Sequence, residues 1–148
     1  MVVDVLRKVI SRDLLKLKQE LELYKNEANI WRVEKDIINP AGNLCLHLVG
    51  NLNTYFGTVL GNTGYVRNRD LEFSQKGVSR KELIRKTEDA IQVVDKVLSQ
   101  MTDDDLKKDY PLEYNNEIVT SEYFLIHLSI HLGYHLGQVN YHRRLLDN

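Results

Sequence analysis

The sequence contains a single cysteine, no surplus of basic residues and no long apolar run. Cys45 stands alone, so no intramolecular disulfide can form and an oxidising compartment is not implied. The 20 basic and 21 acidic residues leave a net charge of −1, which argues against a nucleic-acid partner. No segment approaches the roughly 20 apolar residues of a membrane span, and the first residues lack the form of a signal peptide. These absences predict a cytoplasmic protein without a membrane partner.

The length of 148 residues fits a single domain over residues 1–148, because domains typically run to about 100–150 residues. A chain of this size buries roughly 70% of its unfolded surface and needs no disulfide or metal cross-link to form a stable core. There is no internal repeat and no low-complexity segment.

Four amphipathic segments predict an all-α protein, and no strand pattern competes with them. They cover about residues 3–26, 40–60, 80–100 and 121–146, with apolar residues recurring at three- and four-residue steps. Four helices of about 20 residues pack well as a four-helix bundle. The connections of about 13–19 residues are long for simple hairpins, so the sequence does not determine the topology of the bundle.

Helix-end signals set several of these boundaries. Asn39 before Pro40 predicts a capped helix start with the proline in the first helical position. Gly61 suits the end of that helix. Ser79 and Glu82 have the spacing of a capping box. Between these signals, residues 65–78 and 101–119 are predicted to be irregular.

The placement of histidine is the most informative feature of the chain. Four of the five histidines lie in the last 22 residues, the full set being His47, His127, His131, His135 and His142. On a helical wheel the last four and Gln138 fall within an arc of about 80°. The seam of the last predicted helix is therefore lined with imidazoles.

A bundle core has little reason to contain this much histidine unless something binds it. A buried imidazole must satisfy two ring nitrogens, and an unsatisfied polar group costs a few kcal/mol. Two histidines at i and i+4 can bind one metal ion, and both His127/His131 and His131/His135 have that spacing. The remaining His47, in an apolar helix, is the third candidate ligand. Asn51, one turn further on, could orient a ligand or a bound water.

The competing interpretation is a set of core histidines satisfied by protein groups, with no metal. A single HxxxH pair favours that interpretation, whereas the crowding on one face favours a metal. No carboxylate lies inside HxxxH, so the general base of the HExxH zinc enzymes is missing. The Glu-x-x-His motif of two-metal bundles is also absent.

Two motifs resemble the DinB/YfiT-like superfamily of metal-dependent enzymes. Residues 131–138, His-Leu-Gly-Tyr-His-Leu-Gly-Gln, are similar to its HxxYHxGQ signature. Residues 47–52, His-Leu-Val-Gly-Asn-Leu, resemble a motif of one largely uncharacterised branch, as do Trp31 and residues 67–73. The resemblance covers nearly the whole chain.

The resemblance implies a four-helix bundle, often dimeric, with a three-histidine site for nickel, zinc or a related ion such as iron or manganese. Carried over by motif, the ligands are His47, His131 and His135. His127 then becomes a neighbour of the site, and His142 is expected at the surface near the bundle end.

Further residues are candidates for supporting the site. Gln138 is a candidate for a hydrogen bond to a metal-bound imidazole. Gly133 and Gly137 predict that a helix or a ligand packs closely on the last helix, because glycine costs about 1 kcal/mol in a helix interior. Arg67 and Arg69 either recognise an anionic substrate or are simply solvated.

Three nitrogen ligands leave a coordination position open for water or substrate, as in catalytic rather than structural zinc sites. The resemblance implies a hydrolase or a transferase that uses a low-molecular-weight thiol such as bacillithiol or mycothiol, acting on a small molecule. The alternative is a non-catalytic, stress-related helical dimer with a structural metal or none. The sequence names neither the substrate nor the reaction.

Overall fold

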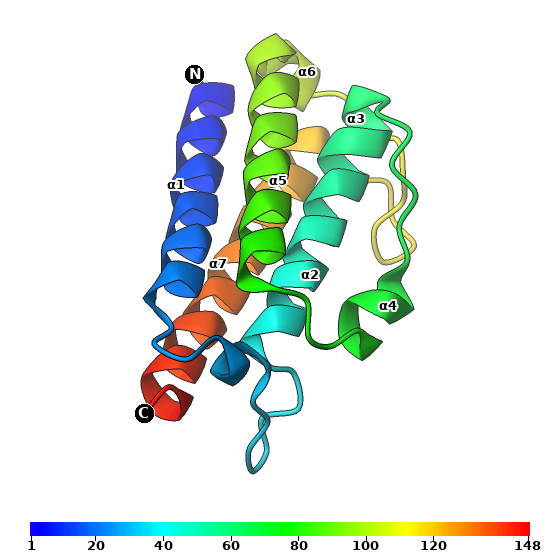
Figure 1. Cartoon of the computed structure of the whole chain (residues 1–148). Helices are drawn as coiled ribbons and strands as arrows, with labels where there is room; N and C mark the ends of the chain where they lie inside the picture. Colours follow the sequence, from blue (N-terminus) through cyan, green and yellow to red (C-terminus); the bar gives the residue numbers. More distant parts are fainter.

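The computed structural model describes residues 1–148 and consists of helices joined by loops, without a β-strand (Figure 1). Four long helical stretches make up the bundle: α1 (Val2–Leu23), α2 (Ala41–Leu52) with its continuation, α5 (Arg80–Gln100) and α7 (Ser121–Leu146). Shorter pieces lie in the connections: η1 (Glu27–Trp31), α4 (Arg69–Ser74) and α6 (Asp103–Leu106). The prediction of an all-helical bundle is confirmed.

Each of α1 and α2 packs against both α5 and α7, which places α1 and α2 on opposite corners of the bundle. The core between them contains 28 buried apolar residues, among them Leu14, Leu17 and Leu21 of α1. None of the helices combines the length and the apolar character that crossing a membrane requires. Because α2 and α7 lie side by side, the two histidine motifs meet across one groove of the bundle.

The predicted helix over residues 40–60 forms, but its interior is not uniform. The π-helical segment η2 (Asn53–Thr58) follows α2 directly, and α3 (Val59–Gly61) ends the stretch. Asn62 adopts a left-handed conformation there (φ 50°), which confirms the end at Gly61. The start differs by one residue, because Pro40 is extended (ψ 165°) and itself occupies the cap position. The predicted Asn39 cap is therefore wrong.

Two segments predicted to be irregular contain short helices. In residues 65–78, the Asn68 side chain accepts a hydrogen bond from the Leu71 amide (3.1 Å) and starts α4. In residues 101–119, Thr102 and Asp105 form a reciprocal capping box that starts α6. Helices of six and four residues are too short to show an apolar period, so tertiary packing and caps decide them.

His142 is buried, with 3% of its surface exposed, and the prediction of a surface position was wrong. Its Nδ1 accepts a hydrogen bond from the Tyr24 hydroxyl (2.6 Å), and its Nε2 donates to the Arg32 carbonyl (2.8 Å). Both ring nitrogens are thereby satisfied by protein groups. Burial lowers the pKa of His142 despite the hydrogen bond to Arg32.

No neighbouring helix packs tightly on Gly133 or Gly137, so that part of the prediction was wrong. A Cβ at Gly137 would have no atom within 4 Å, and one at Gly133 would lie 3.8 Å from an Asp13 carboxylate oxygen. The crowded glycines lie on α2 instead. At Gly42 a Cβ would sit 2.6 Å from the Trp31 ring, so this glycine lets the indole pack on the helix backbone.

Candidate metal centre

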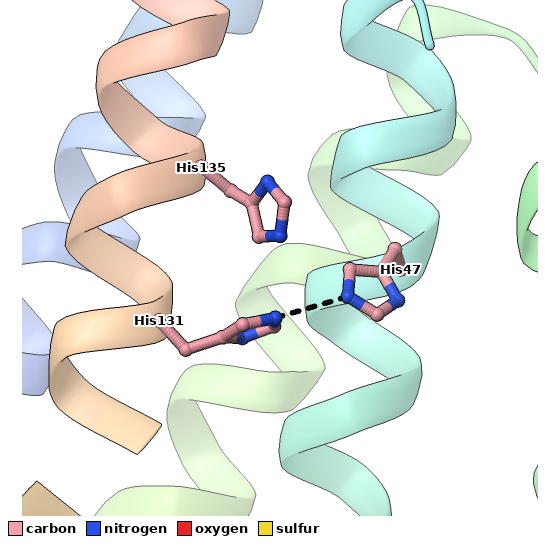
Figure 2. A group of neighbouring side chains, drawn as sticks. All are labelled: His47, His131 and His135. Carbon is pink, nitrogen blue, oxygen red and sulfur yellow. Dashed lines mark hydrogen bonds between the residues drawn. The ribbon is translucent and has the colours of Figure 1, made fainter. Parts of the chain in front are cut away.

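His47 of α2 and the pair His131 and His135 of α7 converge in the groove between the two helices (Figure 2). One ring nitrogen from each lies within 4.8 Å of the others. The Nε2 atoms of His47 and His131 are 3.1 Å apart. Ligand nitrogens about 2.0–2.1 Å from a tetrahedral ion are separated by about 3.4 Å, so nitrogens up to 4.8 Å apart would close by up to about 1.4 Å around one ion.

Protein hydrogen bonds orient two of the three rings. His47 Nδ1 lies 3.1 Å from Glu72 Oε1, and His135 Nδ1 lies 2.7 Å from Gln138 Oε1. A carboxylate oxygen and an amide oxygen can only accept, so each Nδ1 carries the proton. The lone pair of each ring is then on Nε2, the arrangement that metal-bound histidines generally show.

The two imidazoles of α7 in the cluster have lowered pKa values and remain neutral near pH 7. Burial, followed by the neighbouring rings of His135, His47 and His127, lowers the pKa of His131 to about 4. Burial also lowers the pKa of His135, although its hydrogen bond with Gln138 opposes this. Neutral imidazole is the form that binds metal, so these rings need not release a proton near pH 7.

Two buried polar atoms on the helices that carry the cluster have no hydrogen-bond partner, His131 Nδ1 and Asn51 Oδ1. Because His47 Nε2 holds a lone pair, its contact with His131 Nε2 requires His131 to donate there. His131 Nδ1 would then be a buried lone pair without a partner. The Oδ1 atom of Asn51 is likewise buried and unpaired. A cation among the three Nε2 atoms would take the lone pairs of all three rings and would leave the His131 proton on Nδ1, an atom without an acceptor in this structure.

Glu72 is the main site residue that reasoning from the sequence missed. The carboxylate is 6% exposed and accepts two hydrogen bonds from Arg67, at 2.9 and 3.0 Å, besides the one from His47. Burial alone would raise its pKa, but the bonds from His47 and Arg67 outweigh burial and hold the pKa below its ordinary value. Glu72 therefore faces His47 as an anion.

The two candidate arginines have different positions. Arg67 lies beside the cluster, with its Nη2 3.4 Å from His47 Nδ1, but its guanidinium is paired with Glu72. Both atoms of the 3.4 Å contact carry protons, so it is not a hydrogen bond. Arg69 is exposed and lies over the Phe73 ring, 5.3 Å from its centroid.

The short helix α4 brings Glu72 to the site and is tied to α2. Asn43 donates from its side-chain amide to the carbonyls of Glu72 (2.9 Å) and Gln75 (2.8 Å). The Phe73 ring packs on His47, with the centroids 4.9 Å apart. The number of residues between His47 and Glu72 matches no known motif. The sequence feature that could have indicated the contact is Gly50, because a glycine inside a helix leaves room for another side chain, here that of Glu72.

The structure separates His127 from the three converging histidines. Its ring packs on Tyr114 (4.6 Å between centroids) and lies 6.4 Å from the ring of His131. It is absent from the group of nitrogens that could share one ion. Cys45 is fully buried, and burial raises the pKa of its thiol to about 11, so it is no nucleophile.

The family model described as "Protein of unknown function (DUF1572)" matches residues 4–148. The chain belongs to this family. No curated protein matches it.

Gly50 of this DUF1572 protein makes room for Glu72, because a Cβ at that position would overlap the carboxylate. Gly50→Ala is expected to push Glu72 away from His47 and to weaken zinc binding about tenfold, the lower end of the cost of losing a ligand's partner. Titration with a competing chelator measures this. The control Gly137→Ala has open space, and should keep the affinity while raising the free energy of unfolding by up to about 1 kcal/mol. Equal affinities in the two variants would contradict the role of Gly50.

The depressed pKa values of His131, His135 and His142 predict acid sensitivity of the metal-free protein. Below pH 6.5 the unfolded chain binds protons at these rings while the folded protein resists them, so stability is lost as the pH falls towards the folded pKa values. Urea midpoints should therefore decrease between pH 7 and pH 4.5. A midpoint that rises in this range would contradict the shifts.

Proposed function

We propose that this DUF1572 protein is a metal-dependent enzyme in which His47, His131 and His135 hold one divalent ion. The convergence of three imidazoles with two tautomers already fixed is the observation that carries the proposal. We further propose membership of the DinB/YfiT-like superfamily, on the similarity of residues 47–52 and 131–138 to its motifs. The cytoplasmic location expected from the sequence is part of the same proposal.

The chain's own residues would shape the site as follows. Glu72 holds His47 with Nε2 towards the centre, and Gln138 does the same for His135. Arg67 balances the charge of Glu72 in a buried position. When bound, the ion supplies a Lewis acid that lowers the pKa of a bound water or thiol. Three protein ligands leave room for that water or thiol.

All-imidazole donors suit nickel and zinc, with iron as a further candidate. Manganese is proposed only because the superfamily resemblance includes it. A hydrolase or a transferase using a low-molecular-weight thiol is the reaction class that the superfamily resemblance favours. Both would act on a small molecule at the open coordination position.

One observation favours the alternative, a non-catalytic helical protein whose metal is structural or absent. The only carboxylate that touches the cluster, Glu72, is bound by both Arg67 and His47. It is therefore not free to act as a general base. In this alternative the histidines would link α2 to α7 and nothing more.

Assays on zinc- and nickel-loaded protein separate the two functions. A panel of small thiols with electrophiles, and of simple esters and amides, is run with and without metal. If the protein is an enzyme, turnover should require the metal. The bundle should stay folded after chelation, because the core of 28 apolar residues does not depend on the metal site. Loss of folding on chelation, with no metal-dependent turnover, would favour the structural alternative.

A homodimer is proposed as well, and the outer face of α7 supports it. Tyr123, Ile126, Ile130 and Tyr134 expose 41–66% of their surface along that face, and contiguous exposed apolar residues commonly mark protein interfaces. Ile130→Asp is expected to convert the dimer to a monomer in sedimentation at micromolar concentration. A wild-type monomer under the same conditions would refute the dimer.

A further inference from the structure

Arg69 is one of two arginines whose guanidinium group has no hydrogen-bonding partner in the protein. Of the nine arginines in the chain, seven donate hydrogen bonds to carboxylates or carbonyls, whereas Arg69 and Arg144 donate none. Both are exposed and lie over an aromatic ring, Arg69 at 5.3 Å from the Phe73 centroid and Arg144 at 5.1 Å from that of Tyr141. The two differ in what that ring contacts.

The Phe73 ring connects Arg69 to the candidate metal centre. The centroid of this ring lies 4.9 Å from that of His47, so two ring contacts bound the distance from the Arg69 guanidinium to a candidate ligand. The Tyr141 ring beneath Arg144 has no contact of this kind with any of the three histidines. The cluster itself is open to small molecules, because His131 and His135 are only partly buried.

The orientation of α4 places Arg69 on the flank that faces the cluster. Three residues of the other flank line a hollow of about 220 Å³ together with Lys86 of α5: Asn68, Leu71 and Gln75. That flank is therefore turned towards α5. Arg69 and Phe73 are four residues apart and lie about 160° around the helix from Leu71. Because the Phe73 ring packs on His47, the flank that carries Arg69 is turned towards the histidines.

The charges around the cluster favour an anionic ligand. Arg67 and Glu72 form an ion pair and offset each other, and metal-binding imidazoles are neutral. A divalent ion would add two positive charges, and Arg69 adds a third. The acidic residue next to it in the sequence, Asp70, is exposed and forms no ion pair with it. A guanidinium stacked on a ring keeps its N–H edge free for two oxygens of a carboxylate or phosphate.

We propose that Arg69 binds an anionic oxygen group of the substrate, a carboxylate or a phosphate, while the reactive atom of the same molecule reaches the metal ion. The inference rests on the proposed metal-dependent function and adds to it a substrate class, small anions, and a specificity-determining residue. Arg67 does not share this role, because its guanidinium is held by Glu72. Binding at two points fixes the reactive atom relative to the ion, which is how contacts remote from the chemistry accelerate a reaction.

Thiols that carry a terminal carboxylate test this role in the cobalt-loaded protein, where binding is followed by the sulfur-to-cobalt absorption band. The probes are 3-mercaptopropionate, 4-mercaptobutyrate and 6-mercaptohexanoate, each compared with its uncharged amide. An ion pair near a protein surface contributes up to about fivefold in affinity, and a bidentate pair contributes more. Arg69→Gln should therefore reduce the preference for acid over amide at least about threefold for the chain length that spans the two points. Cobalt content and amide affinity should not change.

The matched control is Arg144→Gln, which removes an exposed guanidinium in the same stacked geometry. It should behave as the wild type, because its ring does not contact the cluster. The cobalt ion attracts every anion to the same extent in both variants, so the difference between them isolates Arg69. An equal loss in the two variants, or an unchanged preference in Arg69→Gln at all three chain lengths, overturns the inference while the metal site stands.

Two further outcomes are distinct from these. Binding of 2-mercaptoethyl phosphate that depends on Arg69 supports the inference as well, and its affinity relative to that of the carboxylates distinguishes the two kinds of anion. A protein that binds no cobalt overturns the proposed function, and the inference with it.

Discussion

His131→Ala is expected to abolish stoichiometric metal binding. The three rings form a triangle with centroids 4.6–5.2 Å apart, and His131 has its Nε2 3.1 Å from that of His47. Its removal leaves two nitrogens on different helices. The loss of affinity should exceed the roughly 100-fold that removal of a ligand's hydrogen-bonding partner costs at most. Elemental analysis after dialysis against zinc or nickel measures the stoichiometry.

The matched control is His127→Ala, one turn earlier on the same helix. His127 is a half-buried imidazole that packs on Tyr114 and lies outside the cluster. This variant should retain one ion per chain. Metal content that is equally low in both variants, or unchanged in His131→Ala, would refute the site as drawn.

Glu72→Ala is expected to reduce both stability and metal affinity by large amounts. The substitution leaves the Arg67 guanidinium, whose side chain is 15% exposed, without its partner. Removing one member of a buried ion pair costs about 3 kcal/mol or more. His47 also loses the acceptor that fixes its tautomer, which should weaken metal binding about 10- to 100-fold. Urea unfolding of the metal-free protein and chelator competition measure the two effects separately.

The double variant Arg67→Leu with Glu72→Leu separates the two roles. Replacing a whole buried pair by apolar residues is often neutral for stability, so the double variant should recover most of the lost free energy of unfolding. The metal affinity should stay low, because His47 still lacks its acceptor. Recovery of affinity together with stability would show that Glu72 acts only through the fold.

The parts of this molecule that sequence predicts best are those with a repeating or local signal. The long helices are visible because their apolar residues recur with the helical period. Ser79 caps α5 as expected, accepting a hydrogen bond from the Glu82 amide (3.2 Å). The other half of that capping box does not form, because the Glu82 carboxylate bonds with Arg85 at 2.6 and 2.8 Å. A local motif cannot anticipate such competition between partners.

The site was predictable where chemistry recurs at fixed spacing and not where the fold alone brings groups together. His131 and His135 are one turn apart, and the structure brings His47 to them across the bundle. Glu72 was missed because its partner His47 is 25 residues away and α4 is too short to show a period. His142 was placed wrongly because its partners, Tyr24 and Arg32, lie 118 and 110 residues distant.

The separation of His47 and His131 by 84 residues gives the candidate metal centre a second consequence. An ion held by both would act as a removable cross-link that closes more than half of the chain into a loop, and closing such a loop lowers the entropy of the unfolded chain. Metal at 100 times its dissociation constant would add about 2.7 kcal/mol to the free energy of unfolding. The melting temperature would then report which ion the protein prefers, and a melt across a series of divalent ions ranks their affinities without any knowledge of the substrate.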